Sequence, residues 1–276
     1  MKIALFLTCA SCLFFLVPLS GSSQAPSVVD QIGTIAANSP CARVQWKMRG
    51  RAPAAYMCGT ALVYARAVCH RDRADVQVVS KARLAPGPQA NKTDALTWYD
   101  AQFRELGMSN TTDGVDTLRH AYTLLIGLAM RESSGKYCEG RDQSMNFTTA
   151  DSAEAGIFQT SFKARLRHPT MSELYEKYKA DQIGCLLDVF KQHVSCAAHN
   201  AENFGEGEGK NWQQLTKTCP AFATEYAAVL IRVHGGRTGE FGPLRNHAAE
   251  IQPSCDAMLK QVEELLRVNP EMCSAL

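Results

Sequence analysis

Glu132 has the residue type and position of a catalytic acid. It ends a helix expected over about residues 117–132, which is apolar nearly all round, and the turn Ser133-Ser134-Gly135 follows at once. Burial disfavours the charged form of a carboxyl group, and so does the negative end of a helix dipole, so we expect a raised pKa for Glu132. A carboxylic acid that stays protonated near neutral pH can serve as a general acid. The alternative is a glutamate that reaches solvent past the last turn or pairs with Arg131.

A second motif, Gly156-Ile157-Phe158-Gln159, begins 24 residues after Glu132. A glycine lets a sugar chain approach the backbone, and a glutamine amide both donates and accepts hydrogen bonds. A Glu-Ser helix end followed by a Gly–apolar–apolar–Gln segment resembles the lysozyme-like superfamily, particularly soluble lytic transglycosylases and goose-type lysozymes. The resemblance covers about residues 118–162.

The resemblance implies that Glu132 is the catalytic acid of a glycan-cleaving site. It implies four residues that line the glycan cleft: Ser133, Gly156, Phe158 and Gln159. It also implies a helix that carries a tyrosine near the cleft, for which Tyr226 is the candidate. The family's usual Ala-Tyr-Asn is replaced here by Glu-Tyr-Ala, and a core aromatic is the alternative for Tyr226.

A second carboxylate would decide the reaction. Inverting hydrolysis needs a base that holds water about 6.5–9.5 Å from the acid. Goose-type enzymes carry an Asp shortly before the glycine motif, and Asp151 is the matching candidate here, with Asp142 and Glu154 as competitors. Lytic transglycosylases, by the same resemblance, use the Glu alone and form a 1,6-anhydro sugar by attack of the muramyl 6-hydroxyl. Both outcomes stay open.

Helical periodicity predicts a mainly α fold. Apolar residues recur at helical spacing over residues 54–69 and 220–268, whereas long alternating runs are scarce. The segment 203–211, which holds three glycines, is expected to be a polar loop. The resemblance implies a lysozyme-like α+β domain, with a small β or irregular lobe between Glu132 and Gly156.

The first 25 residues have the pattern of a secretory signal peptide, with Lys2 ahead of an apolar run. We expect a basic helical N-terminal extension over residues 26–95 and a lysozyme-like catalytic domain over residues 96–276. The stretch Ala85-Pro86-Gly87-Pro88 marks a linker near the end of the extension. Residues 43–83 contain nine Lys or Arg and two Asp. This excess indicates either a solvated helix surface or attraction to an anionic polymer.

The cysteines favour an oxidising compartment. Nine of the eleven lie beyond the expected signal peptide, and in an exported chain they are expected to form disulfides. Because nine is odd, at least one stays unpaired within the chain. A disulfide from Cys138 would stiffen the turn after Glu132.

Composition and motifs exclude several other classes. The 276 residues carry 29 basic and 27 acidic side chains, which excludes a strongly charged nucleic-acid binder. No stretch after the signal is long and apolar enough to cross a bilayer. The pattern Ser133-x-x-Lys136 resembles an acyl-transfer motif, but its serine closes a helix rather than opening one. A metal site at His193, Cys196 and His199 is disfavoured, since a secreted cysteine more often forms a disulfide.

We therefore expect an exported, secreted or periplasmic enzyme that cleaves β-1,4 linkages in peptidoglycan or a related amino-sugar glycan. No cofactor and no metal are implied, and no nucleic-acid partner is expected. The rival interpretation is a catalytically inert lysozyme-like module that binds a glycan or a protein. A glycosidase directed at chitin is a third alternative.

Overall fold

The computed structural model describes residues 26–141 and 148–276. The expected signal peptide and Asp142 lie outside the described residues. The α-helices are α1 (Val28–Asn38), α2 (Ala54–Cys69), α3 (Ala74–Ser80), α4 (Pro88–Thr93), α5 (Ala95–Trp98), α6 (Asp100–Glu105), α7 (Val115–Ser133), α8 (Pro169–Ala180), α9 (Leu187–Phe190), α10 (Gly207–Thr218), α11 (Pro220–His234), α12 (Gly242–Arg245) and α13 (Pro253–Val268). Short 3₁₀ helices are η1 (Pro40–Arg43), η2 (Phe162–Arg167), η3 (Ala198–Ala201) and η4 (Pro270–Ala275).

The prediction of a mainly α fold is confirmed. Within the described residues, the strands are β1 (Glu154–Ala155) and β2 (Thr160–Ser161), which pair antiparallel as a short hairpin. Glu154 lies opposite Ser161 and Ala155 opposite Thr160. The hairpin overlaps only the end of the segment between Glu132 and Gly156, where the resemblance implies a small β or irregular lobe.

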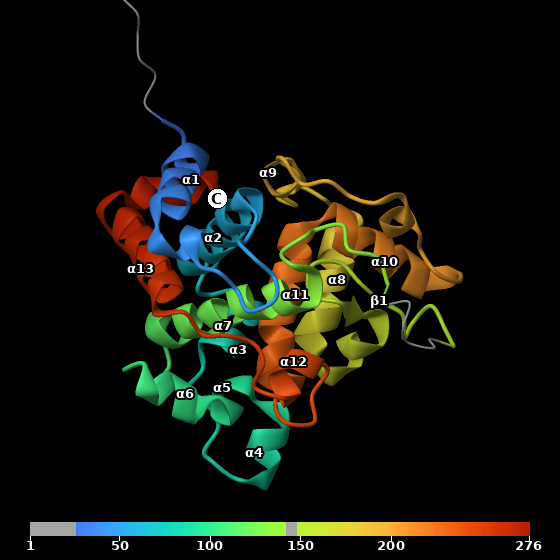
Figure 1. Cartoon of the computed structure of the whole chain (residues 1–276), viewed down its shortest axis with the longest axis horizontal. Coiled ribbons are helices and arrows are strands. Elements are labelled where there is room, and N and C mark those ends of the chain that lie inside the picture. The colour runs from blue at the N-terminus through green and yellow to red at the C-terminus, as the bar shows by residue number, and fades with distance from the viewer. Residues whose placement is uncertain (1–25, 142–147) are drawn as a thin grey trace, which may run out of the picture.

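Helix α7 lies at the centre of the molecule, with other helices on several sides of it (Figure 1). It contacts α2, α3, α11, α12 and α13. Its side chains from Thr117 to Met130 are buried all round, as the apolar pattern predicts. The approach is closest at Gly127, where a Cβ atom would lie 2.1 Å from the carbonyl oxygen of Glu250. A rigid central helix therefore fixes the position of Glu132 at its carboxyl end.

The first and last parts of the described chain pack together. Helix α1 begins at a capping box in which the Ser27 hydroxyl accepts from the Asp30 amide. It contacts α2 and α13, and α1 and α13 are neighbours in Figure 1. One hydrophobic core contains buried residues from Ile32 to Leu266. It includes Ala95 and Leu96, so it does not stop at the predicted boundary between the extension and the catalytic domain. The division into an extension and a catalytic domain stays a prediction; in space, both parts share this core.

Four disulfides form, as expected for an exported chain. The pairs are Cys41–Cys255, Cys69–Cys273, Cys138–Cys196 and Cys185–Cys219. The first two join the N-terminal helices to the C-terminal region across more than 200 residues of sequence. Within the described part of the chain, the unpaired thiol is that of Cys58, which is half-buried.

The prediction of a loop over residues 203–211 is wrong in its second half, because α10 begins at Gly207. Glycine weakens a helix on propensity grounds, but packing outweighs propensity here. A Cβ at Gly209 would lie 2.3 Å from the carbonyl carbon of Ala150, so only glycine allows this approach. Trp212, one turn later, is fully buried and anchors the helix.

No helix in residues 26–141 and 148–276 has the length and apolar character that crossing a membrane requires.

Candidate functional site

The carboxyl end of α7 is closed by two consecutive residues in the left-handed region. Ser134 has φ 57° and Gly135 has φ 72°, and the amides of both donate to the carbonyl of Ala129. Ser133 is buried, and its hydroxyl lies 2.7 Å from the carbonyl oxygen of Ile157, to which it donates. The end of the helix is thus bonded directly to the glycine motif predicted from the sequence.

The turn between β1 and β2 contains that motif. Gly156 has φ 79°, and a Cβ there would lie 2.9 Å from the Cβ of Thr216. Glycine is therefore needed for the turn and for packing against α10, rather than for approach of a sugar. Gln159 also has a positive φ, 48°, which is uncommon for a residue other than glycine. Its side-chain amide donates to the carbonyls of Gly140 and Gly156, both at 3.0 Å, and these bonds hold the turn in place.

A polar cleft of about 550 Å³ opens beside the end of α7. Its described lining residues come from five segments of the chain: Arg49, Arg131, Glu132, Glu139, Gly140, Arg141, Glu154, Gln159, His199 and Pro243. Three carboxylates and three guanidinium groups thus face one hollow, which also contains the imidazole of His199. Charged groups of both signs suit a polar ligand with several hydrogen-bonding groups.

The structure brings Glu132 and Gln159 together in this cleft. Ser133, Gly156 and Phe158 are placed behind its wall instead, where they are buried and support the turn. Phe158 belongs to the hydrophobic core. The prediction that these three residues line a cleft is therefore corrected: they are buried and support the turn from which Gln159 contacts the cleft.

Tyr226 lies in the core rather than at the cleft. It is fully buried, packs on Trp212 with ring centroids 4.4 Å apart, and donates from its hydroxyl to the carbonyl of Ser161. Helix α11 is buried on nearly every face, so helical spacing alone does not reveal which side approaches a ligand. Tyr226 thus supports strand β2 from below, which corrects its predicted contact with substrate.

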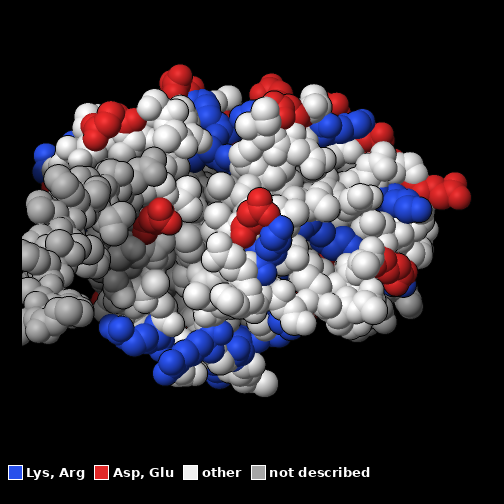
Figure 2. Space-filling model, turned by 90° about the horizontal axis from the view of Figure 1, so that it is seen from above, with Lys and Arg blue, Asp and Glu red and all other residues white. Residues whose placement is uncertain are grey.

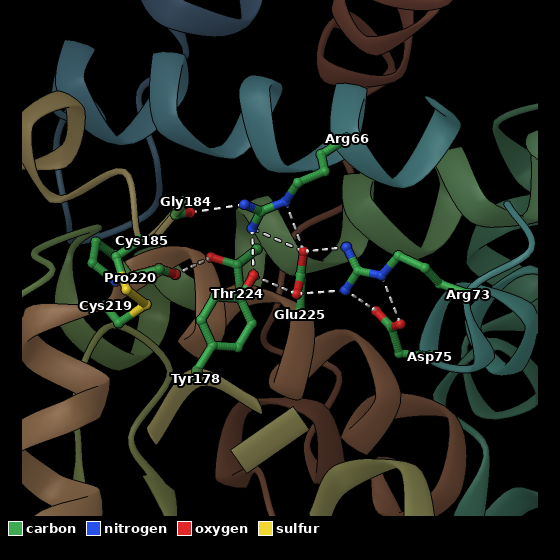
Figure 3. A network of polar contacts seen from close by, with 10 residues as sticks. All are labelled: Arg66, Arg73, Asp75, Tyr178, Gly184, Cys185, Cys219, Pro220, Thr224 and Glu225. Atoms are coloured by element: carbon green, nitrogen blue, oxygen red, sulfur yellow. Dashed lines mark hydrogen bonds and ion pairs between the residues drawn. A yellow bond between two sulfur atoms is a disulfide. The ribbon is translucent and has the colours of Figure 1, made fainter. Parts of the chain in front are cut away.

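The residue before Tyr226 centres a buried ionic network (Figure 3). The Glu225 carboxylate accepts from both Arg66 and Arg73, at distances of 2.7 to 3.0 Å, and from the Tyr178 hydroxyl at 2.9 Å. Burial by itself raises the pKa of Glu225, but the two guanidinium groups and the hydrogen bonds outweigh burial and lower it below its ordinary value. Asp75 holds the far side of Arg73. This network joins α2, α3, α8 and α11.

Asp151 is exposed and is not among the described lining residues of the cleft. Its main chain packs against Gly209, and its carbonyl accepts from the amide of Lys163. Glu154 and Glu139 line the cleft together with Glu132. The role of Asp151 as a second carboxylate stays a prediction, as does that of its competitor Glu154, which unlike Asp151 is among the described lining residues of the cleft.

Glu139 and Arg49 were not predicted as site residues. Glu139 follows the disulfide-bonded Cys138, and its carbonyl accepts from the amide of Gly156, so the segment after α7 folds back onto the turn. The partner of that disulfide, Cys196, lies in the segment that carries His199. Because Cys196 is oxidised in this pair, its thiolate is not available to a metal. No periodic signal marks these residues, and the pairing of Cys138 with Cys196 could not be read from the sequence.

Much of the positive charge predicted for residues 43–83 is neutralised by distant acids. Arg66 and Arg73 pair with Glu225, Lys81 with Asp113, and Arg83 with Asp100. Four exposed basic residues remain in the segment 43–51: Arg43, Lys47, Arg49 and Arg51. The face shown in Figure 2 carries acidic and basic side chains interspersed.

Comparison with known proteins finds no matching family model, no matching curated protein and no matching solved structure.

Proposed function

We propose that this protein is an exported enzyme that cleaves β-1,4 linkages in peptidoglycan or a related amino-sugar glycan, with Glu132 as the general acid. One observation carries the proposal: Glu132 lies at the end of a buried helix and faces a polar cleft. Gln159, in the turn between β1 and β2, lines the same cleft. The motif resemblance over residues 118–162 adds the reaction class. The four disulfides agree with an oxidising compartment.

In this mechanism Glu132 donates its proton to the glycosidic oxygen as the bond to the leaving sugar breaks. Because α7 is packed on all sides, the acid is held in one place, and proximity of this kind accounts for much of an enzyme's rate. The hydrogen bond from the Ser133 hydroxyl to the Ile157 carbonyl holds the end of α7, which carries Glu132, in place against the turn between β1 and β2.

Two outcomes are open, and they differ in whether a second carboxylate of the cleft takes part. If Glu154 holds a water molecule, the product is a reducing sugar formed by hydrolysis. If no base is required, Glu132 takes the proton of the muramyl 6-hydroxyl, which attacks the same carbon and gives the 1,6-anhydro sugar. Glu154 sits in strand β1 of the hairpin, whereas Asp151 lies before it and points to solvent, so Glu154 is the base we propose.

The test is the rate at which purified peptidoglycan releases soluble fragments. Glu132→Gln keeps the volume of the side chain and removes its acid, so we expect a loss of about 10²–10⁴-fold. Glu264→Gln is the matched control, because Glu264 is exposed and remote in the fold on α13. Circular dichroism checks that each variant is folded. Equal rates for wild type and Glu132→Gln would overturn the proposal.

The rival function is an inert module that binds glycan. The cleft itself fits either function, and catalysis distinguishes them. If the wild type binds peptidoglycan but releases nothing from it or from chitin, the binding function replaces the enzymatic one.

A further inference from the structure

A second hollow lies at the other end of α7 from the candidate cleft. Its volume is about 730 Å³, and it is bounded by the end of α2, the start of α7, α13 and η4. It shares no described lining residue with the cleft. Val115 on its wall and Glu132 in the cleft are 17 residues apart on one helix, which at 1.5 Å per residue is about 25 Å. The two hollows are therefore separate.

Most of the surface of this second hollow is apolar. Val68 and Val115 contribute aliphatic side chains from α2 and α7, and Leu266 contributes one from α13. The Cys69–Cys273 disulfide also lines it and joins the end of α2 to η4, so two of its walls are linked covalently. Small-molecule sites have volumes of about 300–1,000 Å³ and are mostly apolar and largely pre-formed. The hollow thus has the size and the lining of a ligand site.

The two acids among its described lining residues are already bonded. Glu263 accepts from the guanidinium group of Arg119 at 2.8 and 3.0 Å and from the hydroxyl of Tyr64. Glu264 forms an exposed ion pair with Arg267 at 2.6 Å. Both carboxylates are therefore engaged by groups other than the remaining cations of the hollow.

Those remaining cations are Arg71 and Lys260. Both are exposed, and they reach the hollow from two walls, because Arg71 follows α2 and Lys260 lies on α13. Within residues 26–141 and 148–276, neither side chain makes a hydrogen bond or an ion pair. The rim of an apolar hollow therefore carries two positive charges that no nearby acid is bonded to.

This combination complements an anionic amphiphile with one acyl chain. Removing methylene groups from water favours binding of the chain. The planar fork of a guanidinium group matches a carboxylate, and an ammonium group adds a second positive charge. A neutral apolar ligand would leave both cations without a partner, and a cationic one would be repelled. The apolar groups also line a hollow instead of protruding, which suits a chain that enters more than a bilayer surface.

We propose that this hollow binds a free fatty acid. The acyl chain lies against the aliphatic side chains and the Cys69–Cys273 disulfide, and the carboxylate lies between Arg71 and Lys260. This site is additional to the candidate cleft and does not rest on the proposed glycan function.

The test is isothermal titration calorimetry of the whole protein with dodecanoate and with dodecyltrimethylammonium, which has the same chain and the opposite charge. Both are used below the concentration at which they form micelles, at low salt and pH ~8. We expect dodecanoate to bind about tenfold more tightly, and this preference decreases when salt is raised. Decanoate, which lacks two methylene groups, should bind on the order of tenfold more weakly than dodecanoate.

The charge is tested by the double variant Arg71→Gln with Lys260→Gln. We expect about a tenfold loss of dodecanoate affinity and no loss of dodecyltrimethylammonium affinity. The matched control is Arg51→Gln with Lys210→Gln, which removes one arginine and one lysine that are exposed and are not among the described lining residues. The control variant keeps the affinity of the wild type for dodecanoate.

The hollow itself is tested by Ala257→Trp. Ala257 is exposed on α13 and lines the hollow, so the larger side chain occupies the hollow without entering the core. We expect this variant to lose binding of both amphiphiles although its charge is unchanged. Circular dichroism checks that each variant is folded.

Several results would overturn the inference: no binding of dodecanoate, equal affinity for the two amphiphiles, equal effects of the two double variants, or full binding by Ala257→Trp. Wild type that binds phosphatidylglycerol vesicles but not free dodecanoate would also overturn it, because the face would then contact a membrane. Release of peptidoglycan fragments is a separate measurement at the other end of α7, so failure of either proposal is distinguishable from failure of the other.

Discussion

Replacing Glu225 by glutamine removes the negative charge at the centre of the buried network shown in Figure 3. Glu225 is 2% exposed and accepts from Arg66, Arg73 and Tyr178. Glutamine keeps the volume and one acceptor, but its amide group faces two guanidinium groups. Asp75 still compensates part of the charge of Arg73, with oxygens at 3.0 and 2.8 Å. Arg66 keeps only the neutral partners Gly184 and Tyr178.

Removing one partner of a buried ion pair costs about 3–5 kcal/mol, because the other charge stays buried without compensation. For a chain of this size, such a loss lowers the melting temperature by on the order of 10 °C. Urea unfolding followed by circular dichroism measures the free energy directly. Glu264→Gln, which breaks the exposed pair with Arg267, is the control and leaves the midpoint unchanged. A loss below about 1 kcal/mol for Glu225→Gln would refute the network as a source of stability.

The same network predicts a pH dependence. The pKa of Glu225 in the folded chain lies below its ordinary value of 4.5, because its two arginines and its hydrogen bonds outweigh burial. A carboxylate with a lowered pKa stabilises the fold above the unfolded pKa, and this contribution is lost as the pH falls through the folded pKa. The difference in the free energy of unfolding between wild type and Glu225→Gln is therefore largest at neutral pH. It becomes smaller as the pH falls below 4.5. A difference that stays constant into acid would contradict the ionic origin.

Gly156→Ala forces a side chain into the left-handed region and against Thr216, so we expect a loss of about 2–4 kcal/mol by urea unfolding. Gly107→Ala, with a similar φ but open space, should cost only about 1 kcal/mol, and equal losses would remove the packing argument. Replacing Cys138 and Cys196 together by alanine should cost up to about 4 kcal/mol and reduce fragment release, because their cross-link holds the segment after the candidate acid; unchanged release would count against that role. Burial raises the pKa of the Cys58 thiol, and a nearby carboxylate adds to the effect, so iodoacetamide at pH ~7 should label it slowly until the chain unfolds. Rapid labelling of the native protein, or labelling of further thiols within residues 26–276 on unfolding without reductant, would contradict this assignment.

Patterns within one element were predictable from the sequence. The apolar residues of α7 and the turn after Glu132 gave a helix over about residues 117–132, and the structure has Val115–Ser133. The stretch 54–69 was predicted as a helix and forms α2 with the same bounds. In both segments the local sequence and the tertiary burial favour the same structure, so periodicity was sufficient.

Features that depend on distant segments were not predictable. The charge of residues 43–83 suggested a positive surface, but Arg66 and Arg73 point inward to Glu225, more than 150 residues away in sequence. Arg49 reaches the cleft because a turn docks on the end of α7, which no local pattern indicates. Tyr226 was misplaced because a helix buried on nearly every face has no apolar stripe to orient it.

The most direct test of the central claim is mass spectrometry of the fragments released from purified peptidoglycan by wild type and by Glu132→Gln. The account predicts new sugar ends from wild type only, either 1,6-anhydro ends or reducing ends. Anhydro ends identify the reaction in which Glu132 acts alone, and reducing ends identify hydrolysis, in which we propose Glu154 as the base. The same new ends at the same rate from Glu132→Gln would contradict the account, because the residue at the end of α7 would then not be the acid.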